Sequence, residues 1–65
     1  MPARDTECDV GCAASMINLG GFYQMEGLTG EAREWFEEGK EVSRAVGYTM
    51  GVEEAEDGLR RLDEV

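Results

Sequence analysis

Residues 18–36 read NLGGFYQMEGLTGEAREWF, and this stretch decides the fold. In its first part, Gly20 and Tyr23 lie at helical spacing on one face. In its last part, an alanine and a phenylalanine lie four residues apart, which is the spacing of a second helix. Gly27 lies between the two patterns, where a left-handed backbone conformation ends a helix. The stretch therefore predicts two antiparallel helices that are joined by a short turn and packed closely through small residues.

The apolar spacing on either side extends this hairpin into an all-α domain of three helices. The predicted helices span residues 10–25, 30–46 and 50–63, and their predicted N-caps are Asp9, Thr29 and Thr49. Residues 1–8 are polar and contain the single proline, so we expect a flexible N-terminus there. The single domain then covers residues 9–65.

Each predicted helix has one face that we expect to be buried. These faces consist of Met16, Leu19, Gly20 and Tyr23 in the first helix, Ala32, Phe36, Gly39 and Ser43 in the second, and Val52, Ala55, Leu59 and Leu62 in the third. Two further stripes accompany them: Ala14, Ile17, Asn18, Gly21 and Met25, with Gln24 at the edge, and Trp35, Val42 and Val46. A helix with two such stripes has either two packing partners or one packing partner and one binding face.

The charge of the chain limits the class of partner. Six basic residues against 15 acidic residues give a formal net charge of -9 at pH 7. Nucleic acids and anionic membrane surfaces attract basic patches, so we expect neither of them as a partner. The sequence shows no signal-peptide pattern, and no apolar run approaches the ~20 residues of a membrane span. These features predict a cytoplasmic protein.

The sequence contains no recognisable catalytic group. It has no histidine, which removes the commonest general base and metal ligand. Cys8 and Cys12 are four residues apart and could hold a metal or respond to oxidation, but a structural zinc site needs two further ligands. We interpret one as a loop thiol and the other as a small helix residue. The carboxylates lie at helical spacing, which is typical of a solvated surface, so we expect no enzyme activity, cofactor or metal.

The hairpin follows the pattern Met16-x-x-Leu19-Gly20-x-x-Tyr23, then Gly27, then Ala32-x-x-x-Phe36. This pattern resembles the tetratricopeptide repeat, whose helical hairpins stack into a right-handed superhelix. Residues 45–51 are similar to the longer, roughly 40-residue variant of that repeat. The chain departs from the family at Met16, where a large aromatic residue is usual, and at Gly39, where alanine is usual. The resemblance implies about one and a half repeats, with the third helix as a polar cap.

The resemblance also implies a function, namely a protein-interaction module that presents a groove to a peptide or protein partner. In the family, an asparagine before the Leu-Gly pair often holds the backbone of a bound peptide, which assigns that role to Asn18. The residues that the resemblance implies around it are Ala14, Ile17, Gly21, Gln24 and Met25. Apolar contacts at Ile17 and Met25 would then supply affinity.

Two alternatives to a peptide groove stay open. Repeat arrays usually need about three repeats, so the chain could complete its core by forming a homo-oligomer through Trp35, Val42 and Val46. Trp35 itself suits either core packing or an interaction anchor. The second alternative is an acidic regulator that occupies a basic protein surface, which the net charge of -9 favours.

Overall fold

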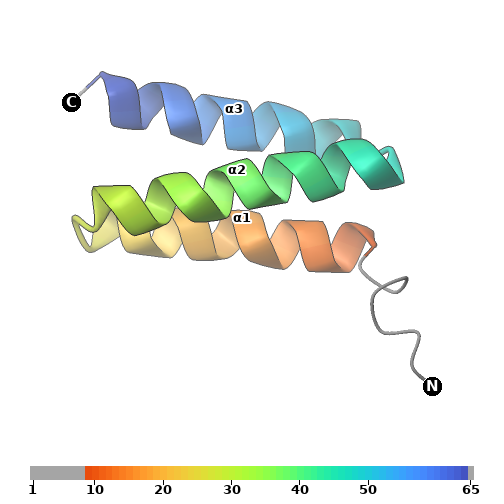
Figure 1. Ribbon diagram of the computed structural model, residues 1–65, viewed down its shortest axis with the longest axis horizontal. Helices are drawn as coiled ribbons and strands as arrows, with labels where there is room; N and C mark the ends of the chain where they lie inside the picture. Colours follow the sequence, from red (N-terminus) through yellow and green to blue (C-terminus); the bar gives the residue numbers. More distant parts are fainter. Residues whose placement is uncertain (1–8, 65) are drawn as a thin grey trace.

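Three antiparallel helices make up the described part of the chain. The computed structural model describes residues 9–64, in which α1 spans Val10–Met25, α2 spans Thr29–Val46 and α3 spans Thr49–Asp63. α2 lies between the other two helices and packs against both, whereas α1 and α3 contact each other less (Figure 1). The all-α architecture predicted from the hairpin pattern is therefore confirmed. The predicted flexible segment, residues 1–8, lies outside the described residues.

The two turns between the helices have the same backbone geometry. Gly27 and Gly47 adopt left-handed conformations, with φ angles of 83° and 78°. The residue after each glycine donates its N–H back to a helix carbonyl, that of Tyr23 at 2.9 Å and that of Ser43 at 2.7 Å. This is the Schellman arrangement, in which glycine avoids the clash that a Cβ atom causes at positive φ. Each reversal is therefore short, and the helices run back alongside one another.

The helix starts agree only in part with the predicted caps. The carboxylate of Asp9 caps α1 as predicted, because its Oδ1 accepts a hydrogen bond of 3.1 Å from the backbone N–H two residues later. The prediction of Thr29 and Thr49 as N-caps is wrong. The N-caps are Leu28 and Tyr48, which make no side-chain capping hydrogen bond. The short Schellman turns are the reason, since the chain re-enters a helix one residue earlier than the threonine pattern indicates.

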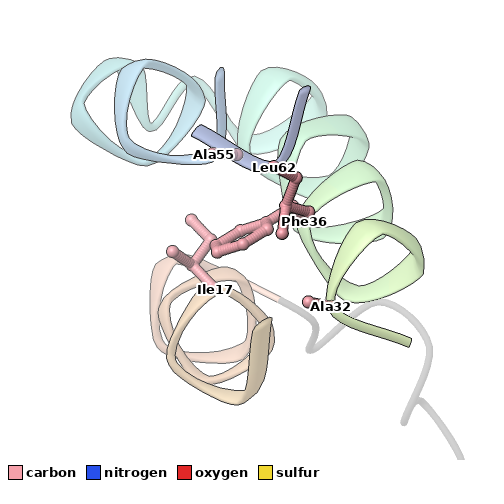
Figure 2. Packing of buried hydrophobic residues seen from close by; sticks show 5 residues of the cluster. All are labelled: Ile17, Ala32, Phe36, Ala55 and Leu62. Carbon is pink, nitrogen blue, oxygen red and sulfur yellow. The ribbon is translucent and has the colours of Figure 1, made fainter. Parts of the chain in front are cut away.

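The side chain of Phe36 is the largest in the buried core. Its ring points from α2 into the space between α1 and α3, toward Ile17 (Figure 2). A Cβ atom added at Gly20 would lie 2.8 Å from the ring Cδ1, and one added at Gly58 would lie 2.5 Å from Cζ. Both distances are far below van der Waals contact. The ring is therefore held between two backbone segments that only glycine allows to come this close.

Other helix contacts also depend on small residues. A Cβ atom at Gly39 would lie 2.8 Å from the Cγ1 of Ile17, and one at Gly51 would overlap Ser43 and Tyr48. The alanines of the core, one from each helix, are fully buried: Ala13, Ala32 and Ala55. The three helices consequently approach one another closely, and few large side chains fill the core.

The predicted buried faces hold for α2 and need correction for α1. All four predicted residues of α2 are buried. In α1 the buried residues are Ala13, Ile17 and Gly20, whereas Leu19 is 37% exposed. The prediction for Leu19 is wrong because α1 contacts both α2 and α3, and its buried centre lies between the two predicted stripes. Ile17, which we assigned to the outer stripe, belongs to the core.

In α3 the predicted stripe is buried at two of its positions. Ala55 and Leu62 are buried, whereas Val52 and Leu59 are only half-buried. Two glycines, Gly51 and Gly58, occupy the remaining buried positions. Apolar patterning alone does not reveal this face, because half of its contact residues have no side chain.

Two exposed ion pairs join α2 to α3. The Nη2 of Arg33 lies 3.0 Å from the Oδ1 of Asp63, and the Nζ of Lys40 lies 3.4 Å from the Oε2 of Glu56. Exposed pairs of this kind contribute about 0–1 kcal/mol each. Close packing, rather than charge, therefore holds α3 in place.

Adjacent glycines in α1 provide a test of this packing. We expect Gly20→Ala to lower the free energy of unfolding by about 1–2 kcal/mol, because the added methyl meets the Phe36 ring, which Gly58 blocks from behind. Gly21→Ala is the matched control, because nothing lies within 4 Å of its added Cβ. This variant should gain about 0.5–1 kcal/mol from helix propensity. Urea unfolding followed by circular dichroism measures both, and equal stabilities would contradict the described position of the ring.

The hydroxyl of Ser43 provides a second test. Its Oγ is fully buried and has no hydrogen-bond partner within residues 9–64. Ser43→Ala removes this unsatisfied group, so we expect the free energy of unfolding to rise by about 1 kcal/mol. Ser15→Ala, at an exposed position of α1, reports the gain from helix propensity alone. A gain at residue 43 that is smaller than the gain at residue 15 would show that the hydroxyl stabilises the fold.

Candidate functional site: the groove between α1 and α3

An open groove of about 570 Å³ runs between α1 and α3, with α2 behind it. We call it the α1–α3 groove. All three helices contribute to its lining: Ile17, Asn18, Gly21, Phe22, Gln24 and Met25 from α1, Phe36 from α2, and Glu54, Asp57, Gly58 and Arg61 from α3. The groove exists because α1 and α3 both pack on α2 and meet each other less closely.

The floor of the groove is apolar and well packed. Ile17 is 7% exposed and Phe36 is 3% exposed, so both belong to the core and present only an edge to the groove. Gly21 also lines the groove but has no side chain to fill it, and a Cβ atom added there would meet nothing within 4 Å. The floor is therefore fixed by core packing, while the space above it is open.

The α1 side of the groove carries two large apolar side chains that the fold leaves uncovered. Phe22 is 54% exposed and Met25 is 86% exposed. The ring of Phe22 packs edge-on against Tyr23, with centroids 5.5 Å apart and planes at 70°. That contact limits the positions open to the Phe22 ring, whereas Met25 has an unbranched side chain that adapts to its surroundings.

Polar groups lie on both sides of the groove. Asn18 is exposed and Gln24 is half-buried, and each amide offers two donor hydrogens and an acceptor oxygen. On the α3 side, the Oδ2 of Asp57 lies 3.2 Å from the Nε of Arg61. Arg60 also lies 3.6 Å from Asp57, whereas among residues 9–64 no cation lies within ion-pair distance of Glu54, so Glu54 is the unpaired charge on the α3 side.

The structure brings most of the predicted groove residues together. Ile17, Asn18, Gly21, Gln24 and Met25 all line the α1–α3 groove. Ala14 does not line it, because it lies one helical turn nearer the start of α1, where the groove has ended.

Sequence reasoning missed Phe22 and every residue from α2 and α3. Phe22 follows Asn18 by four positions, so the helical spacing carries a signal for it. Glu54, Asp57 and Arg61 carry no such signal, because their place in the groove depends on how α3 lies beside α1.

The predicted self-association stripe lies on α2, outside the groove lining. Trp35, Val42 and Val46 are all half-buried within the three helices. Trp35 borders a shallow hollow with Met16, Glu34 and Glu38. These side chains are therefore already covered in part by the fold.

A third surface is strongly charged. It lies along the outer side of α2 and is lined by Glu34, Glu37, Glu38, Lys40, Glu41, Arg44 and Leu59. Carboxylates outnumber cations there, as the sequence pattern predicts for a solvated face.

The cysteines do not form part of the groove. Cys8 lies outside the described residues, and Cys12 is half-buried in the first turns of α1 and takes part in a disulfide. The interpretation of the two cysteines as a loop thiol and a small helix residue is therefore corrected, because Cys12 is oxidised. Within residues 9–64, no group of three or more histidine, cysteine or acidic side chains could hold a metal ion. None of the three helices combines the length and the apolar composition that crossing a membrane requires.

No protein-family model, curated protein or solved structure matches the chain. The resemblance to the tetratricopeptide repeat stays a prediction that depends on the residues quoted above.

Proposed function

We propose that the chain is a non-enzymatic protein-interaction module that holds a peptide or protein segment in the α1–α3 groove. The observation that carries this proposal is the exposure of Phe22 and Met25 beside a floor that the core has already buried. Full burial of such a side chain contributes about 1.5–3 kcal/mol. A partner that covers the exposed parts of both would gain about 2–4 kcal/mol.

The amide of Asn18 supplies the polar part of this proposed recognition. It is exposed at the groove, where it can donate to an oxygen and accept from an N–H of the partner, in a side chain or in the backbone. A hydrogen bond of this kind contributes about 0.5–1.5 kcal/mol. Its role is to fix the position of the partner along the groove, while the apolar side chains supply most of the affinity.

The resemblance to the tetratricopeptide repeat supports the proposal from a separate direction. Under this proposal, α1 and α2 form one repeat and α3 is the first helix of a second. The asparagine that the resemblance assigns to peptide binding borders the α1–α3 groove, as do four of the five residues assigned around it.

We favour the groove over self-association for two reasons. Trp35, Val42 and Val46 are half-buried, so a second copy would gain less apolar burial on them than a partner gains on Phe22 and Met25. Each copy also has a formal net charge of -9, which opposes the approach of another copy.

Peptides selected from a random phage-displayed library on the wild-type protein test the proposal. We expect Phe22→Ala and Met25→Ala each to weaken the binding of selected peptides about tenfold, which corresponds to about 1.4 kcal/mol. Leu19→Ala is the control, because Leu19 is an exposed apolar residue of α1 outside the groove lining. Met25→Ala should leave the folded state nearly unaffected, since Met25 is 86% exposed, and urea unfolding checks that Phe22→Ala and Leu19→Ala, whose side chains are partly covered, remain folded.

The Asn18→Ala variant tests the polar contact separately. We expect it to weaken binding about three- to tenfold, because one hydrogen bond is lost. Titration calorimetry with the selected peptides measures all of these affinities. Failure to select any peptide, or peptides that bind all four variants as they bind the wild type, would overturn the proposed function.

A further inference from the structure

We propose that the occupant of the α1–α3 groove is a basic amphipathic helix. This inference rests on the proposed function and adds the charge and the conformation of the partner. It follows from three features of the groove: an unpaired carboxylate on α3 in a chain of strong negative charge, exposed apolar side chains on α1 across from it, and few groups that could satisfy an extended backbone.

Carboxylates dominate the α3 side of the groove. Glu54 and Asp57 line it, and both also line an adjoining hollow that adds Glu53 and Met50. Asp57 is already paired, because Arg61 of the lining lies 3.2 Å from it and Arg60 lies 3.6 Å from it. Within residues 9–64, neither Glu53 nor Glu54 has a cation within ion-pair distance. A lysine or arginine of a partner would therefore find an unpaired carboxylate at Glu54 in the groove and a second at Glu53 in the adjoining hollow.

The overall charge of the chain also favours a basic partner. The formal net charge of -9 repels an acidic segment and raises the encounter rate with a basic one. It also disfavours a second copy of this chain as the occupant, because that copy carries the same charge. A basic segment is thus the partner whose charge complements this surface.

Exposed apolar side chains accompany the carboxylates. Phe22 and Met25 line the α1 side of the groove, and Met50, which is 63% exposed, lies one helical turn before Glu54 in the adjoining hollow. Methionine is flexible and polarizable, so it adapts to the ridges of a partner's side chains. An occupant that matches this surface has an apolar stripe bordered by cations, which is the pattern of an amphipathic basic helix.

The groove favours a helix over an extended strand. Every residue of an extended segment brings one N–H and one C=O that need partners, and an unpaired group over an apolar floor is costly. The amides in the described lining belong to Asn18 and Gln24, and these could satisfy only a short stretch. A helix satisfies its own backbone and can pack between α1 and α3 as a further helix, with ridges in grooves.

Model peptides of about 14 residues test the inference. The first contains only leucine and lysine, arranged so that leucine forms one helical stripe. The second has the same composition in an order that gives no stripe, and the third replaces every lysine with glutamate. We expect the first peptide to bind at least tenfold more tightly than either of the others, to gain helical circular dichroism on binding, and to weaken steeply as salt is added.

A pair of charge reversals tests whether the groove itself recognises the cations. We expect Glu54→Lys to weaken binding of the leucine–lysine peptide about five- to tenfold. Glu41→Lys is the matched control, because Glu41 is also an exposed helical glutamate but lies on the outer side of α2. It changes the net charge by the same amount and should weaken binding less than about twofold at physiological salt.

The outcomes separate this inference from the proposed function. Equal weakening by Glu54→Lys and Glu41→Lys would overturn the inference, because recognition would then depend only on net charge. Peptides that bind in extended or acidic form, and lose binding in Phe22→Ala, would overturn the inference and leave the groove function standing. Absence of any groove-dependent binding, by these probes and by library peptides alike, would overturn both.

Discussion

The structure depends on one close contact, in which the ring of Phe36 is held between Gly20 of α1 and Gly58 of α3. A ring carried by the central helix can touch both neighbours at once only if their backbones come close to it from either side. A side chain at either glycine would push its helix outward, and the ring has no free space into which to retreat. This contact therefore sets the separation of α1 and α3 from α2. It thereby also sets the width of the α1–α3 groove. The two Schellman turns have a complementary role, because short reversals at Gly27 and Gly47 keep the three helices aligned along their length.

The same contact explains why a groove forms between α1 and α3. α1 and α3 contact each other less than either contacts α2, and the Phe36 ring and Ile17 lie at the edge where they meet (Figure 2). Above that edge no large core side chain remains to close the gap, because Gly21 and Gly58 border it. The apolar side chains of α1 that point there, Phe22 and Met25, consequently stay exposed. The close packing of the groove floor and the exposure of the side chains beside it thus both result from one arrangement of small residues.

Local signals in the sequence predict local structure well and long-range placement poorly. The Asp9 cap and the buried face of α2 follow from spacing and side-chain chemistry, and both agree with the structure. Threonine is a good N-cap in isolation, but Thr29 and Thr49 are not N-caps here. The hydrogen bonds of each turn bring the chain into the helix before the threonine is reached. The buried face of α1 differs from the predicted one because a helix with two neighbours has its buried centre between them, which no single periodic stripe describes.

The residues that α3 contributes to the groove are the hardest to predict from the sequence. Gly58 offers no apolar signal, and Glu54 and Asp57 have the spacing of ordinary surface carboxylates.

The small core links stability to occupancy of the groove. Three of its buried residues are alanines, so Phe36, Ile17 and Leu62 supply most of the large apolar surface that the fold removes from water. Two of these three also form the groove floor. A partner seated in the groove would lie over these two buried side chains and would itself cover Phe22 and Met25, and its cations would offset the negative charge that otherwise repels within the domain. Any ligand that binds only the folded state stabilises that state by mass action. In a domain of this size, whose folding free energy is a small difference between large terms, that gain is a considerable fraction of the total. Binding and folding of this chain are therefore expected to be coupled, since the groove exists only when α1 and α3 are packed on α2 around the Phe36 ring.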